Sequence, residues 1–193
     1  MNRRSRFRIV DLTGDCADWI DQAATLLHTA FRDRSASWPD LESARRTVVE
    51  SLEPGKISRV ALGDANEVVG WIGGEAMYDG HVWEIHPLVV AERHRRAGLG
   101  RALVGDLERL VAERGALTLY AGSDDETGET NLSGMDLYAD IPGAIRGVRN
   151  LKGHPYEFYM KLGFRIVGVM PDANGRGKPD IFLAKHVERS RRN

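Results

Sequence analysis

The sequence predicts a mixed α/β fold in which helices flank a β-sheet, and three observations lead to that prediction. Strand-like and helix-like hydrophobic patterns follow one another in the order β-α-α-β-β-β-α-β-insert-α-β-β. The clearest pattern, at 98–114, places apolar residues three and four positions apart on one helix face. With 42% hydrophobic and 28% charged residues, the composition is that of a globular protein. A chain of 193 residues fits one hydrophobic core, so we expect 1–193 to form a single domain.

The predicted elements are separated by polar turns and by glycine or proline residues. Strands are predicted where apolar residues alternate or cluster, at 7–12, 60–62, 67–78, 83–90, 117–121, 164–169 and 181–185. Helices are predicted where apolar residues recur at helical spacing, from Asp15 through Ala30 and at 41–52, 98–114 and 155–162. The polar segment 123–150 is predicted to be irregular.

The charge balance excludes a general nucleic-acid binder, because such proteins are usually strongly basic and this chain has a net charge of -1. Arginines crowd both ends, and we interpret them as solvated termini: Arg3, Arg4, Arg6, Arg8, Arg189, Arg191 and Arg192. Cys16 is the only cysteine, so an intrachain disulfide is excluded and a reducing compartment is expected. No apolar run reaches signal-peptide or membrane-spanning length. These features predict a cytoplasmic protein without a membrane partner.

The strongest chemical signal is a basic turn between a strand and a helix, at 88–101. Gly98 and Gly100 open the helix, whose unpaired N–H groups and partial positive charge favour anions. Arg95, Arg96 and Arg101 add positive charge and directional donors. The turn fits neither the dinucleotide fingerprint nor the mononucleotide P-loop. We therefore predict a phosphate-binding turn, with a purely structural turn as the alternative.

The turn resembles the Arg/Gln-x-x-Gly-x-Gly/Ala pyrophosphate loop of the GCN5-related N-acetyltransferases (GNAT), and 158–164, Phe-Tyr-Met-Lys-Leu-Gly-Phe, resembles a second motif of that family. The resemblance implies a mixed, largely antiparallel sheet flanked by helices, with acetyl-CoA as cosubstrate. It also implies that the strand at 88–90 binds pantetheine through its backbone and that Tyr159 lies near the coenzyme sulfur. The implied coenzyme-binding residues are Leu88, Val89, Val90, Arg95, Arg96, Ala97, Gly98, Leu99, Gly100, Arg101 and Tyr159.

A closer resemblance is to the aminoglycoside 6'-N-acetyltransferases. It rests on 83–90, 154–159, 171–175 and 177–181, which recur in order, whereas the first 80 residues resemble that group only loosely. It implies acetylation of an aminoglycoside amine, most simply the 6'-amine, and a role in antibiotic resistance. Dimers are common in the family, so a homodimer is expected by analogy.

An acidic segment independently fits a cationic acceptor. Between Ala121 and Asp140 there is no Lys or Arg, and the acids are Asp124, Asp125, Glu126, Glu129, Asp136 and Asp140. Carboxylates attract and orient a polycationic amino sugar. We take Asp124, Asp125 and Glu126 as candidate substrate contacts, and a solvated acidic loop is the alternative.

Three further residues are candidates for the acceptor site. Glu84 lies in a strand among apolar neighbours, where a carboxylate needs a partner, and it is the candidate base for the acceptor amine. Strand alternation places Glu84, His86 and Leu88 on one face unless a bulge shifts the parity. His86 and Trp38 are candidate acceptor contacts, with a buried core position as the alternative for each. Glu84 alternatively forms a structural ion pair.

These assignments imply direct transfer within a ternary complex. The backbone N–H near Leu88 would stabilise the developing oxyanion, and Tyr159 would protonate the leaving thiolate. No metal site is expected, because the sequence shows no regular ligand spacing. Two other functions stay open: a GNAT enzyme acting on another amine, such as a polyamine or a protein N-terminus, and an acyl-CoA-binding regulator without turnover.

Overall fold

The computed structural model describes residues 7–187, which fall into two compact units. The first unit contains 7–117 and Val187, and the second contains Thr118–His186. The prediction of a single domain over the whole chain stays a prediction. Of the basic ends, only Arg8 lies within the described residues, and its guanidinium donates a 2.5 Å hydrogen bond to Asn66 Oδ1.

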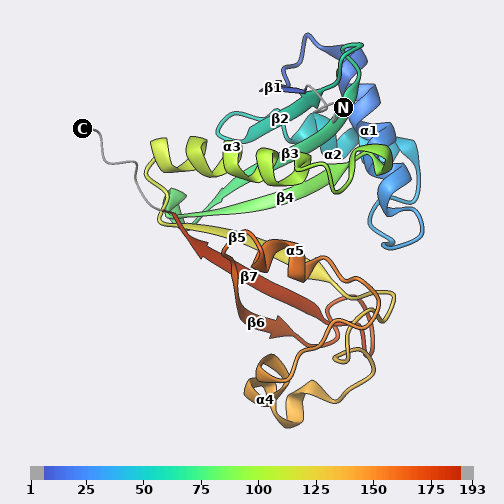
Figure 1. Ribbon diagram of the computed structural model, residues 1–193, viewed down its shortest axis with the longest axis vertical. Coiled ribbons are helices and arrows are strands. Elements are labelled where there is room, and N and C mark those ends of the chain that lie inside the picture. Colours follow the sequence, from blue (N-terminus) through green and yellow to red (C-terminus); the bar gives the residue numbers. More distant parts are fainter. Residues whose placement is uncertain (1–6, 188–193) are drawn as a thin grey trace, which may run out of the picture. The chain divides into compact units, whose positions relative to one another are not determined.

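The first unit is a four-stranded antiparallel sheet with helices on both faces (Figure 1). The strands follow chain order: β1 Arg8–Asp11, β2 Ile57–Leu62, β3 Val68–Met77 and β4 Val82–Val90. On one face, α1 Ala17–Phe31 and α2 Leu41–Glu50 enclose a core that includes Trp71 and Val89. On the other face, α3 Leu99–Glu113 lies so close that added side chains at Gly70 and Gly74 would meet its leucines.

β2 begins three residues before the predicted strand at 60–62, and the added residues include Arg59, a buried and paired charge. Arg59 is 9% exposed. Its guanidinium binds Asp11 at 2.6 Å and Asp106 of α3 at 2.7 Å. A buried Arg is stable only with such partners, and its polar character hides the strand from hydrophobic patterning.

A β-bulge interrupts the pairing of β3 with β4. Gly74 pairs with Ile85 and Ile72 pairs with Leu88, so Gly73 faces both His86 and Pro87. A side chain at residue 73 would place its Cβ 2.1 Å from the carbonyl oxygen of His86, so only glycine allows this approach.

The bulge corrects the predicted alternation of β4. Glu84 and His86 share the α1/α2 face as predicted, but Leu88 does not join them. Its partner Ile72 alternates with Trp71, which belongs to the α1/α2 core, so Leu88 and Ile72 turn toward the opposite face. The extra residue in β4 is the physical cause, because it reverses the parity of every position that follows.

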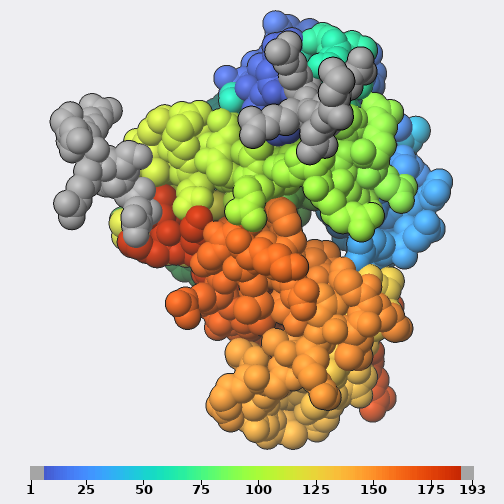
Figure 2. Space-filling model, viewed as in Figure 1, coloured from blue at the N-terminus to red at the C-terminus, as the bar shows by residue number. Residues whose placement is uncertain are grey.

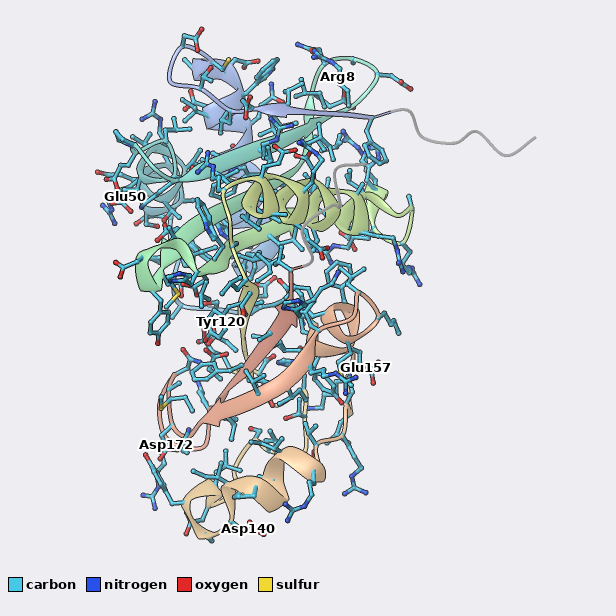
Figure 3. The ribbon with its side chains drawn as sticks, turned by 90° about the vertical axis from the view of Figure 1, so that its left-hand side faces the viewer. Arg8, Glu50, Tyr120, Asp140, Glu157 and Asp172 are labelled. Carbon is cyan, nitrogen blue, oxygen red and sulfur yellow. The ribbon has the colours of Figure 1, made fainter. Side chains whose placement is uncertain are left out.

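The second unit has a three-stranded antiparallel sheet, with β7 Asp180–His186 between β5 Thr118–Asp124 and β6 Arg165–Met170. The helix α5 Tyr156–Met160 precedes β6. The prediction that 123–150 is irregular is wrong at two places, because β5 continues to Asp124 and α4 spans Ile141–Arg146. Asp140 starts α4 by accepting a 2.8 Å hydrogen bond from the Gly143 N–H, and Pro142 occupies its first turn (Figure 3).

The predicted fold class is confirmed: a mixed α/β protein with antiparallel strand pairs flanked by helices. Among the helices of 7–187, none has both the length and the apolar character required to span a membrane.

Candidate active site

The start of α3 has the features that favour anion binding at a helix N-terminus. β4 ends at Val90, a short 3₁₀ turn covers Glu92–His94, and the chain then enters α3 through Gly98. Arg96 and Gly98 have left-handed backbones, with φ of 61° and 87°. Gly98 supplies no capping side chain and the first turn holds no acid, so the N–H groups of that turn have no side-chain acceptor from the cap. The segment is exposed at the surface (Figure 2, bright green).

The residues around this turn fit a pyrophosphate. Arg95, Arg96, Ala97 and Arg101 are exposed, and the Arg95 Nε is held by the Val90 carbonyl at 3.3 Å. A Cβ added at Gly98 would meet no heavy atom within 4 Å, so the approach to the helix start is open. Val89 and Leu99 are 3% and 1% exposed, so their side chains belong to the core and only their backbones can serve a ligand.

We expect Gly98→Asp to weaken acetyl-CoA binding by at least about tenfold, because it places a negative charge beside the phosphates. Gly98→Asn is the matched control: it has nearly the same shape and faces the same positive φ, but carries no charge. Calorimetric titration of each folded variant with acetyl-CoA measures the difference. Equal affinities for the two variants would mean that no phosphate lies at this turn.

Glu84 of β4 is half-buried, and its environment favours the protonated form. Burial is the main cause that raises the pKa of Glu84, the nearby Glu75 raises it further, and His86 opposes them. Glu75 is its direct partner across the β3–β4 pair. A carboxyl group with a raised pKa is a better proton acceptor near neutral pH than an ordinary surface glutamate.

Two aromatic residues complete the first unit's candidate site. The Trp38 ring lies 6.4 Å from the ring of exposed His86, centroid to centroid. Helices α1 and α2 fix Trp38: its Nε1 donates to Thr47 Oγ1 at 2.9 Å, and Phe31 packs edge-on at 4.9 Å. The structure thus brings Trp38 to the sheet face that carries Glu84 and His86.

In the second unit, Tyr159 of α5 is buried among aromatic rings. Its ring lies 5.2 Å from that of Phe158 and 5.4 Å from that of Phe164. Burial raises the pKa of Tyr159, so its hydroxyl keeps its proton throughout the neutral range. Tyr159 therefore has a proton to give at neutral pH, and burial at the same time makes it a weaker acid than an exposed tyrosine.

The acidic segment divides into exposed and enclosed carboxylates. Asp125 is fully buried, and its carboxylate accepts hydrogen bonds from the Glu129 N–H, the Thr130 N–H and the Thr130 hydroxyl, at 2.6, 3.0 and 2.7 Å. We therefore assign Asp125 to loop support and no longer to acceptor contact. Asp124 is exposed and accepts from the Asn174 amide at 2.6 Å, and Glu126 is half-buried. Asp136 and Asp140 are exposed and cap short helical turns.

Asp125→Asn should lower the free energy of unfolding by about 2–4 kcal/mol, because an amide presents an N–H where the loop needs an acceptor. Asp136→Asn is the control, since Asn caps a turn as well as Asp does. Urea unfolding followed by circular dichroism compares the two variants. An unchanged midpoint for Asp125→Asn would return this residue to the candidate acceptor contacts.

Sequence reasoning gave no role to His154, which is 2% exposed. Its Nε2 lies 3.0 Å from the carbonyl oxygen of Asp124, and its Nδ1 lies 3.2 Å from the Tyr156 N–H. The backbone N–H fixes Nδ1 as the acceptor, so Nε2 is the donor. His154 thereby ties the end of β5 to the start of α5, the helix that carries Tyr159. The His-Pro-Tyr-Glu-Phe-Tyr stretch was the available signal.

Comparisons with known proteins place the chain in a family. The sequence model described as the acetyltransferase (GNAT) family matches residues 21–140. The solved structure of an aminoglycoside 6'-N-acetyltransferase complexed with coenzyme A is 39% identical, with a TM-score of 0.86, covering 96% of this chain and 99% of that one. The aminoglycoside 6'-N-acetyltransferase from Enterococcus faecium is also 39% identical over the same shares, with a TM-score of 0.84.

A third structure, aminoglycoside 6'-acetyltransferase type Ii, is 36% identical with a TM-score of 0.70, covering 94% of this chain and 97% of that one. The comparison with curated proteins found no match. The family match covers more than half of the sequence, and the structural likeness extends over nearly all of it. This chain belongs to the GNAT family of acetyltransferases.

Proposed function

We propose that this protein is an aminoglycoside 6'-N-acetyltransferase that moves the acetyl group of acetyl-CoA directly to the 6'-amine within a ternary complex. The observation that carries the proposal is the 39% identity, over 96% of the chain, to an enzyme of that activity complexed with coenzyme A. The open, arginine-rich start of α3 and the grouping of Glu84, His86 and Trp38 on one sheet face support it.

The coenzyme side of the proposal rests on the turn after β4. Arg95, Arg96 and Arg101 and the N–H groups of the first turn of α3 hold the pyrophosphate, and the backbone of 88–90 holds pantetheine. Bound acetyl-CoA supplies an activated acetyl group. The N–H of Leu88 donates to the carbonyl oxygen on which negative charge develops.

On the acceptor side, Glu84 removes the proton that the ammonium group must lose before its nitrogen can attack, directly or through one water. His86 and Trp38 contact the acceptor, and Asp124 and Glu126 contribute negative charge that attracts a polycation. Tyr159 supplies the proton that the departing sulfur takes up. Acetylation turns an ammonium group into a neutral amide, and loss of that charge is the proposed basis of antibiotic resistance. We further propose that the enzyme is a cytoplasmic homodimer.

An acceptor panel tests the proposal. The protein is incubated with acetyl-CoA and one amine at a time, and free thiol release is followed. The panel contains an aminoglycoside with a 6'-amine, the otherwise identical compound with a 6'-hydroxyl, a polyamine, and a peptide with a free N-terminus. We expect kcat/KM to be highest for the 6'-amine compound. Preference for the polyamine or the peptide would assign the protein to another GNAT activity, and coenzyme binding without thiol release for any amine would favour a regulator.

A further inference from the structure

A row of three charged residues crosses the sheet of the first unit beside the candidate base. Glu84 of β4 pairs directly with Glu75 of β3. Ile57 of β2 pairs with Gly74, so Lys56, one residue earlier, comes opposite Glu75. Residues opposite one another in antiparallel strands share a face, with Cβ atoms about 5 Å apart. The row Lys56–Glu75–Glu84 therefore lies on the face that carries His86.

The one lysine of this row is shared between two carboxylates, so neither carboxylate is fully neutralised by it. Lys56 Nζ lies 3.0 Å from Glu75 Oε1 and 3.2 Å from Glu53 Oε2, and its side chain is only 23% exposed. Burial lowers the pKa of Lys56, but the hydrogen bonds to Glu75 and Glu53 outweigh burial and raise it overall. Lys56 is thus a permanent cation shared between two carboxylates, which leaves part of the negative charge of Glu75 facing Glu84.

We propose that Glu75 adds to the effect of burial and raises the proton affinity of Glu84, and that Lys56 limits this effect by holding the Glu75 carboxylate. This inference rests on the proposed function, in which Glu84 accepts the proton of the acceptor amine. Like charges on neighbouring strands disfavour simultaneous ionisation, so the negative Glu75 makes Glu84 hold a proton more tightly. Glu75 acts only through Glu84 and is a positioning residue.

The groups that face Glu84 within the first unit come from several elements. His86 of β4 opposes Glu75 electrostatically, Lys56 pairs with Glu75 directly, and Glu53 acts on Glu75 only through Lys56. Among them, Glu75 is the carboxylate directly opposite Glu84 in the strand pairing. Its ion pair with Lys56 reduces the negative charge that Glu84 meets across the strand pair.

Two single variants should change the pH dependence in opposite directions. Glu75→Gln removes the repelling charge, so the acid limb of kcat/KM against pH should shift to lower pH by about half a unit or more. Lys56→Met nearly keeps the size of the side chain but leaves the charge of Glu75 uncompensated. The acid limb should therefore shift to higher pH by a similar amount. Glu53→Gln is the matched control: it leaves Lys56 to Glu75 alone, so the acid limb should shift only slightly, and to lower pH, opposite to Lys56→Met.

The deciding measurement is a carboxyl ¹³C NMR titration of Glu84 in the full chain and its variants, with the resonance identified by its loss in Glu84→Gln. Opposite displacements in Glu75→Gln and Lys56→Met, with a much smaller Lys56→Met effect in the Glu75→Gln background, support the inference. An unmoved resonance, or displacement in one direction for both, overturns it. If the resonance moves while the kinetic acid limb does not, Glu75 controls Glu84 but Glu84 is not the base, and the proposed catalytic role fails instead.

Discussion

Replacing Tyr159 with Phe should lower kcat by about 10²- to 10⁴-fold while leaving the affinity for acetyl-CoA intact. The variant keeps the ring that packs edge-on against Phe158 and Phe164, so α5 should hold its place. It loses only the hydroxyl, which burial keeps protonated. Because the missing function is a proton donor for the leaving thiolate, raising the pH should not restore turnover.

Tyr156→Phe is the matched control for this prediction. Tyr156 is a second buried tyrosine of α5, one helical turn earlier, and the proposed mechanism gives its hydroxyl no part. Steady-state kcat and calorimetric coenzyme affinity are measured for both variants between pH 6 and pH 9. An unimpaired Tyr159→Phe enzyme would show that the thiolate leaves without an acid.

Replacing Glu84 with Gln should depress turnover most near neutral pH, by about 10²-fold or more if general base catalysis is fully lost. Gln nearly preserves the shape of the side chain but cannot take up a proton. At high pH more of the acceptor amine is already neutral, so the activity of this variant should partly recover. That recovery distinguishes Glu84 from Tyr159.

The pH profile of kcat provides the comparison, with Glu84→Asp as the conservative variant. A shorter carboxylate should lower the rate but keep the acid limb, and because burial raises the pKa of the native group, the limb should lie above that of an ordinary glutamate. Parallel profiles for wild type and Glu84→Gln, without recovery at high pH, would reduce Glu84 to a substrate contact or a structural partner.

Local hydrophobic patterns predicted most helices and strands, because apolar residues recur at different spacings in the two. The helix at 98–114 was predicted to within one residue at each end. The spacing of apolar residues could not reveal α4, whose six residues complete fewer than two turns. Nor could it reveal the start of β2, where buried Arg59 depends on Asp11 and Asp106 far away in sequence. Elements that need distant partners are hidden from a local pattern.

The candidate site, like the fold, was predictable only where its residues stand out locally in the sequence. The basic turn and Glu84 stand out in the sequence, since a carboxylate among apolar neighbours is unusual. The sheet face that Leu88 occupies was not predictable, because it depends on the β-bulge at which Gly73 of β3 packs against the His86 carbonyl of β4. Nor can sequence tell which of two adjacent acids, Asp124 or Asp125, turns inward. The pairing of Glu75 with Glu84 is likewise a matter of strand register.

The most direct test of the proposed activity is to locate the new acetyl group. An aminoglycoside with several amines is incubated with the protein and acetyl-CoA, and the product is analysed by mass spectrometry and two-dimensional NMR. We predict a single added acetyl group, on the 6' nitrogen, formed with one free thiol per acetyl transferred. A product acetylated at another amine, or no acetylated product from a protein that binds acetyl-CoA, would contradict the proposed function.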